Sequence, residues 1–231
     1  MPFFTLFDPM YWIIVGPTLL LALWATIRVK GTFARYHKVG VRSGMTGAEA
    51  AAAVARAGGA TGVTIERAKG FLSDHYDPRS RTLRLSPDVY DGRSISAIAV
   101  GAHEAGHAVQ HAHGYAWLNF RSQMVPVAGI GSNLWIWIFF AGLFLNAPVL
   151  INVGIVLFAL VVLMQLVTLP VEFDASNRAK AVLAQTGIVS TPEEARGVSS
   201  VLGAAAMTYV AGALTAVATL LYYILLANRR N

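Results

Sequence analysis

Four long apolar stretches occur along the chain, at residues 11–27, 126–145, 149–169 and 202–227. Each lacks Asp, Glu, Lys and Arg, and each has about the ~20 residues that a helix needs to cross a bilayer. The one sizeable polar segment, residues 28–122, separates the first stretch from the second. The pattern predicts a mainly α-helical membrane protein with four transmembrane helices and one small domain outside the lipid.

The polar segment has the signals of a small α+β domain. A helix is predicted over the alanine-rich residues 50–57, after a capping box of Thr46 and Glu49, and another from about residue 94 to residue 113. Short apolar runs predict three strands, with a turn at 77–80 between the last two; the strands cover residues 63–66, 71–76 and 82–85.

The basic residues predict which side of the membrane each segment occupies. Five Lys and Arg residues follow the first apolar stretch within residues 28–42, whereas only Asp8 is charged before it. By the positive-inside rule, residue 28 onward lies in the cytosol. Residues 146–148 are too few for more than a tight turn, so the second and third stretches form a hairpin that returns the chain to the cytosol. In this topology Arg229 and Arg230 would lie outside the cytosol, against the positive-inside rule, but the five basic residues within 28–42 outnumber them.

This topology divides the chain into five segments. They are an N-terminal transmembrane helix, a cytosolic zinc-binding α+β domain, a transmembrane hairpin, a second cytosolic segment and a C-terminal transmembrane helix, at residues 1–27, 28–122, 123–169, 170–200 and 201–231.

Composition narrows the possible chemistry. Hydrophobic residues make up 55% and charged residues 13% of the 231 residues, which is too apolar for an ordinary soluble domain. Membrane topology accounts for the formal charge of +6, so we expect no nucleic-acid partner. Because the chain has no cysteine, a transition metal would have to bind imidazole and carboxylate groups.

The sequence His103-Glu104-Ala105-Gly106-His107 is an H-E-x-x-H motif. A helix places residues four apart on one face, so both imidazoles can bind a single zinc ion. Zinc lowers the pKa of bound water, and Glu104 could then take the water's proton as a general base. A solvated helix that merely carries histidines is the alternative, but Glu and His are unfavourable in so apolar a helix without a role.

A catalytic zinc needs a third protein ligand, and three residues are candidates. His111 lies eight residues after His103, a helical rise of about 12 Å, which is too far for one ion. His113 has the spacing of a longer H-E-x-x-H motif, but that motif needs a glycine where this chain has Gln110. Glu172 follows the third apolar stretch, on the side to which the hairpin returns the chain.

Two carboxylates stand close together after the hairpin. Pro170 suits the first turn of a new helix, on which Glu172 and Asp174 would point in different directions. Asp174 could accept a hydrogen bond from a ligand histidine. Alternatively, both carboxylates only complement the dipole at a helix start.

Three segments carry a resemblance to a known family. Residues 94–110, residues 74–78 with 83–86, and the segment LPVEFDA at residues 169–175 resemble the bacterial YugP-like membrane zinc metallopeptidases. The likeness covers nearly the whole chain, including its four apolar stretches. More distantly, the layout is similar to the HtpX-like membrane gluzincins, which also place a transmembrane hairpin between H-E-x-x-H and a ligand glutamate.

The resemblance implies a function and a set of site residues. It implies a multi-pass metalloendopeptidase of the bacterial plasma membrane that binds one zinc, faces the cytosol and cleaves protein or peptide substrates. The zinc ligands would be His103, His107 and Glu172, with Glu104 as the catalytic glutamate. The chain departs from the HtpX-like pattern at Ser176, where those proteins carry aspartate. Asp174 is the candidate for that aspartate's role.

Hydrolysis of a peptide bond forms an oxyanion that a hydrogen-bond donor must stabilise. The sequence offers three candidates for this donor and does not choose among them: His75, Tyr76 and Tyr209. The gluzincin likeness also implies an edge strand that pairs with the substrate backbone above the motif helix, for which residues 82–86 are the candidate.

Two other functions remain as alternatives. A site-2-type intramembrane protease also carries H-E-x-x-H, but it would bury the motif in a spanning helix and add an L-D-G sequence, which this chain lacks. A non-catalytic zinc-binding scaffold or a transporter is the other, although the apolar stretches offer few polar residues beyond Asn133, Asn152 and Gln165 for an ion path.

Overall fold

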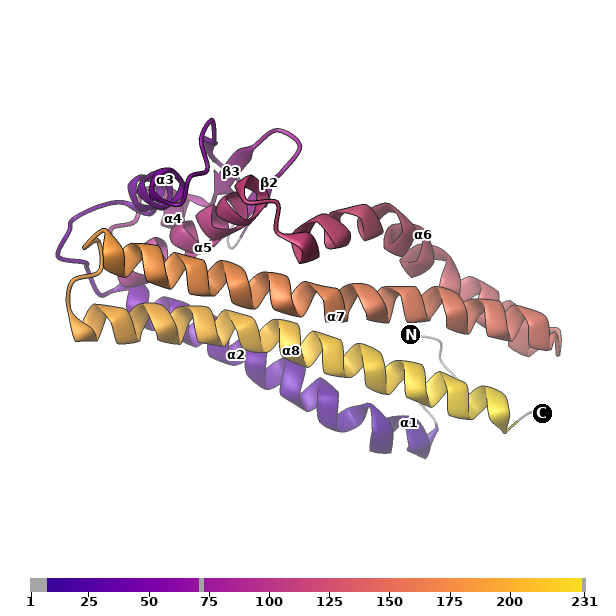
Figure 1. Ribbon diagram of the computed structural model, residues 1–231. Coiled ribbons are helices and arrows are strands. Elements are labelled where there is room, and N and C mark those ends of the chain that lie inside the picture. The colour runs from indigo at the N-terminus through magenta and orange to yellow at the C-terminus, as the bar shows by residue number, and fades with distance from the viewer. Residues whose placement is uncertain (1–7, 71–72, 230–231) are drawn as a thin grey trace. The chain divides into compact units, whose positions relative to one another are not determined.

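The computed structural model of the chain describes residues 8–70 and 73–229. It is mainly helical and contains one small sheet (Figure 1). Contacts divide it into two compact units. The first holds the described residues up to Thr26, Phe120–Leu169 and those from Thr208 on, and the second holds Ile27–Asn119 and Pro170–Met207.

The described residues contain eight helices and three strands. In chain order they are α1 (Pro9–Ile14), α2 (Gly16–His37), α3 (Gly47–Ala57), β1 (Thr64–Arg67), β2 (His75–Asp77), β3 (Thr82–Leu85), α4 (Pro87–Tyr90), α5 (Ile95–Ala112), α6 (Ala116–Phe144), α7 (Pro148–Gln185) and α8 (Pro192–Asn228).

Three helices of the described chain, α6, α7 and α8, are long and apolar enough to cross a membrane. The first predicted span, residues 11–27, is divided between α1 and α2, with Val15 between them. Helix α2 then continues past Arg28, Lys30 and Arg35, and these charges lower its apolar character. The transmembrane role of residues 11–27 therefore stays a prediction.

An aromatic cluster forms the core of the first unit. Phe139, Phe158, Tyr222 and Tyr223 are buried there with Tyr11. Their rings meet mostly edge to face, which aromatic quadrupoles favour. The hydroxyl of Tyr222 donates to Asp8 Oδ2 at 3.0 Å, so the polar end of this buried ring has a partner.

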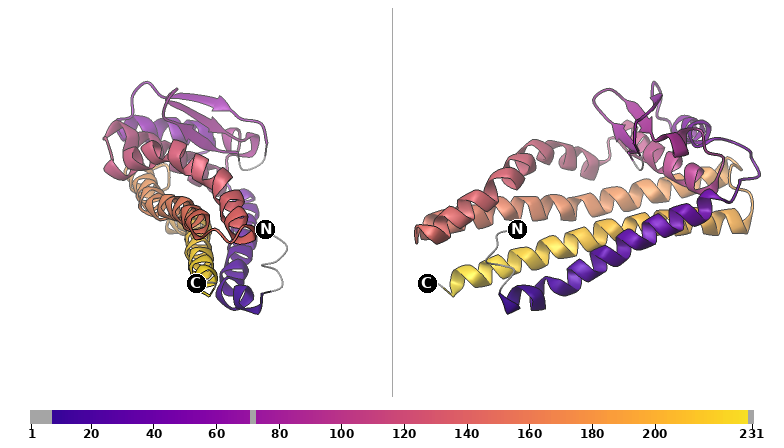
Figure 2. Two further views of the ribbon diagram at one scale, coloured as in Figure 1. Left: turned by 90° about the vertical axis from the view of Figure 1, so that its right-hand side faces the viewer. Right: turned by 180° about the vertical axis from the view of Figure 1, so that it is seen from behind.

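The second unit packs α3, α5 and the sheet around one apolar core. The predicted capping box is confirmed, since Thr46 accepts from the Glu49 amide and Glu49 accepts from the Thr46 amide. Helix α5 begins after Ser94, whose hydroxyl accepts from the Ala97 amide, and ends before His113. Strands β2 and β3 lie over α5 (Figure 2).

The sheet corrects the expectation for residues 82–86. Its strand order is β1-β3-β2, with β3 parallel to β1 and antiparallel to β2. Strand β3 is therefore central and has no free edge, because both of its sides are used for pairing. The predicted strand at 71–76 is found as His75–Asp77, and residues 71 and 72 lie outside the described residues.

Asp77 closes the β2–β3 hairpin. Its carboxylate accepts from the Ser80 hydroxyl and the Arg79 amide, which lower the pKa of Asp77 to about 2. Arg84 of β3 also contacts this carboxylate, at 3.4 Å. The hydrogen bonds and ion pair of the Asp77 carboxylate are thus all made within the β2–β3 hairpin.

Two prolines lie inside helices rather than at their starts. Pro126 is within α6 and Pro170 is within α7, which runs unbroken from Pro148 to Gln185. The expectation that Pro170 begins a new helix is wrong. A proline inside a helix removes one backbone hydrogen bond, and the helix continues through Pro170 because its other residues still pack and bond on both sides.

Gly101 allows α5 and α3 to pack backbone against backbone. A Cβ at Gly101 would overlap the backbone carbonyl oxygen of Gly47, at the start of α3. The two helices share the apolar core of the second unit, so any displacement here would loosen that core.

We expect Gly101→Ala to destabilise the second unit by about 1–3 kcal/mol, because a backbone atom cannot move aside as a side chain can. Thermal unfolding of the detergent-solubilised protein measures this. Gly31→Ala is the matched control: Gly31 is an exposed helical glycine with nothing within 4 Å of an added Cβ. A Gly101→Ala melting temperature equal to that of the control would show that the contact is not tight.

Candidate metal centre

Helix α5 presents the two histidines of the motif together. His103 and His107 lie one turn apart, and their ring centroids are 4.8 Å apart. His107 is buried and His103 is nearly so. Both rings belong to the second unit.

A close approach of α5 to α7 brings Glu172 to these rings. A Cβ at Gly106 would overlap the backbone carbonyl oxygen of Ala175, so the two helices meet at their backbones at this point. Glu172 Oε2 then lies 3.2 Å from His103 Nε2 and 3.6 Å from His107 Nε2. One ligand atom from each of the three residues lies within 4.8 Å of the others. The structure thus groups the three predicted metal ligands.

The electrostatics of the cluster suit a cation. Burial would raise the pKa of Glu172, but its hydrogen bonds to His103 and His107 outweigh burial and place that pKa well below its usual range. Burial would lower the pKa of His107, but Glu172 and Glu104 together with the Gln110 hydrogen bond raise it overall. The buried carboxylate therefore remains charged and favours positive charge beside it.

The far nitrogen of each histidine ring has a partner of its own. His103 Nδ1 lies 3.0 Å from Ser176 Oγ, on α7. His107 Nδ1 lies 3.0 Å from Gln110 Oε1, three residues further along α5. Both rings are held from behind, with Nε2 directed toward Glu172.

Hydrogen bonds fix the orientation of the Gln110 amide. Its Nε2 donates to the backbone oxygen of Val171 and to Asp174 Oδ2, each at 2.8 Å, and both partners can only accept. Its Oε1 therefore faces His107, and His107 Nδ1 must carry the hydrogen. In the neutral ring, this leaves the lone pair of Nε2 for a metal ion.

Asp174 continues this network away from the histidines. Its Oδ2 also accepts from Arg178 Nε at 2.6 Å, and Arg178 Nη1 donates to His113 Nδ1 at 3.1 Å. The guanidinium lies over the ring of Tyr115. Asp174 thus supports His107 through Gln110, rather than by the direct contact with a histidine that the sequence suggested.

The remaining candidate residues are placed as follows. Glu104 is partly exposed and makes no hydrogen bond or ion pair among the described residues. His75 is exposed, with its Nδ1 near the Ser73 oxygen, and the Tyr76 hydroxyl pairs with His111 Nδ1 at 2.8 Å. No described contact joins His75 or Tyr76 to the cluster. Tyr209 belongs to the first unit, and its role stays a prediction.

Gln110, Ser176 and Arg178 are the residues of this centre that sequence reasoning did not assign. A glutamine three residues after His107 is within reach of that histidine on the same helix, so the spacing was available as a signal. Ser176 had no such signal, because its partner His103 lies on a different helix. Arg178 had an i,i+4 spacing to Asp174 on α7, but its second partner, His113, lies at the end of α5.

The donor set fits a catalytic zinc ion. Two imidazole Nε2 atoms and one carboxylate oxygen make three protein ligands of the types that zinc takes, which leaves one position for water. The partners behind both rings are of the kind that orient metal-binding histidines.

Comparisons with known proteins agree with this donor set. The family model described as "putative neutral zinc metallopeptidase" matches residues 11–228. The chain is 46% identical, over 206 residues, to the protein named "Putative membrane protease YugP" of Bacillus subtilis (strain 168), a match that covers 89% of this chain and 91% of that protein. No solved structure matches the chain. The chain therefore belongs to the family described as "putative neutral zinc metallopeptidase".

Proposed function

We propose that this protein is a membrane-integral zinc metalloendopeptidase that hydrolyses peptide bonds near the cytosolic surface of the bacterial plasma membrane. The observation that carries the proposal is the grouping of one ligand atom each from His103, His107 and Glu172 within 4.8 Å. Glu104, beside them on α5, makes no hydrogen bond or ion pair with any described residue. The family and the relative from Bacillus subtilis support a protease at a membrane.

The three grouped residues would hold one zinc ion per chain. When bound, zinc polarises a substrate carbonyl and makes water acidic enough to attack at neutral pH. Ser176 and Gln110 hold the Nδ1 side of the two rings, so Nε2 of each would be available to the ion. The negative charge of Glu172 offsets part of the ion's charge.

Glu104 would act as the general base. It follows His103 directly, so its side chain leaves the helix beside the metal-binding face. Without a hydrogen bond or ion pair in the described chain, its carboxylate is free to take a proton from the attacking water and to deliver it to the leaving amine. The oxyanion stabiliser is not assigned, because no described contact joins His75 or Tyr76 to the cluster, and the role of Tyr209 stays a prediction.

The proposed membrane topology rests on the positions of the apolar stretches and the basic residues along the sequence. Glu172 comes three residues after the apolar stretch 149–169, and five basic residues follow the stretch 11–27. A four-span topology with residues 28–122 and 170–200 in the cytosol accounts for both features.

The structure gives the intramembrane alternative no support. The motif helix α5 is not among the helices of the described chain that could cross a membrane, and it packs with a sheet in the second unit. A non-catalytic zinc scaffold would share the ligands, so a test of Glu104 is needed to separate it from an enzyme.

We expect purified protein to carry about one zinc per chain, and His103→Ala combined with His107→Ala to carry almost none, because one carboxylate cannot retain the ion alone. Elemental analysis after dialysis measures this. His37→Ala, which removes an exposed histidine, is the control and should retain zinc. A full zinc load in the double variant would refute the ligand assignment.

We expect Glu104→Gln to keep its zinc but to lose casein cleavage by about 100-fold or more, because an amide cannot accept the proton. The comparison pairs zinc content with the rate of peptide release. Glu193→Gln, at an exposed position, should match the wild type in both. Normal cleavage by Glu104→Gln would mean that the base is another group; no cleavage by the wild type would favour a scaffold.

We expect Gln110→Leu to weaken zinc binding by about 10- to 100-fold, because His107 loses the acceptor that holds its tautomer. Competition with a fluorescent chelator measures the affinity, and a thermal melt in excess zinc checks the fold. Gln185→Leu, at an exposed position of α7, is the control. Equal affinities in the two variants would show that the Gln110 contact does not position the ligand.

A further inference from the structure

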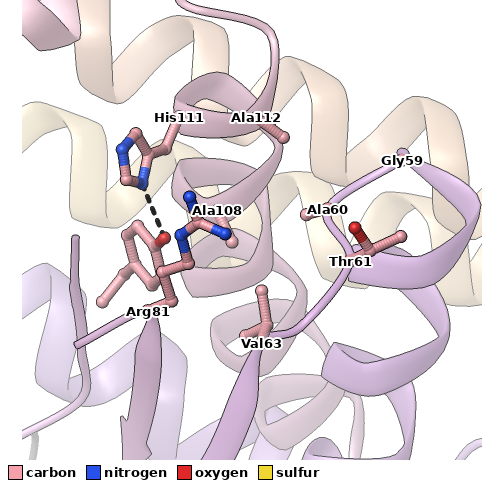
Figure 3. Close-up of a pocket in the computed structure, with 9 residues that line it drawn as sticks. Gly59, Ala60, Thr61, Val63, Arg81, Ala108, His111 and Ala112 are labelled. Atoms are coloured by element: carbon pink, nitrogen blue, oxygen red, sulfur yellow. Dashed lines mark hydrogen bonds between the residues drawn. The ribbon is translucent and has the colours of Figure 1, made fainter. Parts of the chain in front are cut away.

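A second polar site opens beside the C-terminal half of α5. The pocket has a volume of about 250 Å³ and is lined by the loop 59–63, by Tyr76 and Arg81, and by Ala108 and His111 of α5 (Figure 3). All of these residues belong to the second unit. None of them is used by the metal centre described above.

The pocket lies on the Glu104 side of the motif helix. Residues 104, 108 and 111 are spaced by four and three, so they share one stripe of α5. His103, His107 and Gln110 form a neighbouring stripe, which contacts α7. From Glu104 to His111 the helix rises about 10 Å, which an extended peptide spans in about three residues.

The polar side chains that line the pocket are positive or hydrogen-bonding, and alanine and valine side chains complete its wall. Arg81 and Ala108 both line the pocket (Figure 3). The Tyr76 hydroxyl pairs with His111 Nδ1 at 2.8 Å, and Thr61 adds a hydroxyl. Among the described residues, no Asp or Glu lines the cavity.

Arg81 has no acidic partner in the described chain. The nearest acid along the hairpin, Asp77, is occupied by Ser80, the Arg79 amide and Arg84. Arg84 is itself shared between Asp77 and Glu66. The guanidinium of Arg81 is therefore an uncompensated charge at a concave surface.

The backbone of Arg81 is also unusual. Its φ is +51°, in the left-handed region that favours glycine, and its carbonyl oxygen accepts from the Thr64 amide. An arginine held in this disfavoured conformation at the pocket wall points to a role for its side chain.

We propose that this pocket binds a carboxylate of the peptide substrate, about three residues from the cleaved bond. The carboxylate is either an acidic side chain or the free C-terminus. A guanidinium matches both oxygens of a carboxylate, and the pocket hydroxyls can add hydrogen bonds. The inference rests on the proposed peptidase function, since it places the substrate along the Glu104 side of α5.

The test begins with a casein-derived peptide whose cleaved bond has been mapped. Versions with Glu or Gln at each position two to four residues from that bond, on either side, are made with a free or an amidated C-terminus. The full-length wild type, Arg81→Gln, Arg81→Glu and Arg79→Gln are compared by kcat/KM. Arg79 is an exposed arginine in the same turn that does not line the pocket, so Arg79→Gln is the matched control.

We expect the wild type and Arg79→Gln to prefer one carboxylate-bearing peptide by about tenfold over its neutral partner. Arg81→Gln should bring this ratio close to one, and Arg81→Glu should reverse it. A Glu-over-Gln preference identifies a side chain, and a free-over-amidated preference identifies the C-terminus. Zinc content equal to that of the control confirms that the variants are folded.

Binding of the same peptides to Glu104→Gln, measured by fluorescence anisotropy, separates the two proposals. If the wild type cleaves nothing, the peptidase proposal fails. Casein-derived peptides with Glu or Gln, and with a free or an amidated C-terminus, can still be compared for binding to the wild type and to Arg81→Gln, and a charge preference that only the wild type shows would support the pocket. No preference between the members of any pair, or a preference that survives in Arg81→Gln, would overturn the carboxylate site.

Discussion

The close contact of α5 with α7 at Gly106 and Ala175 is the constraint on which the centre depends. Without a Cβ on Gly106, the two helix backbones can approach until Glu172 lies 3.2 Å from His103 Nε2. Any larger residue would overlap the Ala175 carbonyl and separate the carboxylate from the rings. Glycine at this place in the H-E-x-x-H sequence therefore joins two parts of the chain that lie 69 residues apart.

A polar network extends this contact behind the ligands. Gln110 of α5 donates to Val171 and Asp174 of α7, so the residue that orients His107 also binds the two helices together. Arg178 then links Asp174 to His113 at the end of α5. Buried polar groups are costly when unpaired, and the buried Gln110 amide has partners both on its own helix and on α7. Ligand orientation and helix packing thus depend on the same hydrogen bonds.

Helix α5 uses its two sides for different tasks in the proposed enzyme. One stripe faces α7 and would hold the ion, whereas the neighbouring stripe carries Glu104 and continues to the pocket at Arg81 and His111. The sheet has β3 at its centre, so its free edges belong to β1 and β2. Of these, β2 supplies Tyr76 to the pocket, which places the edge strand and the uncompensated arginine on the same side of the motif helix.

The sequence by itself determined what is local. The capping box at Thr46, the extent of α5 and the pairing of His103 with His107 follow from spacing along one helix. Glu172 was proposed from hairpin topology and family likeness, but only the packing of α5 on α7 brings its oxygen to the rings. The central position of β3, the continuous helix through Pro170 and the roles of Gln110, Ser176 and Arg178 were decided by tertiary structure. Strand order and contacts between helices depend on residues distant along the chain, and no local pattern encodes which of them meet.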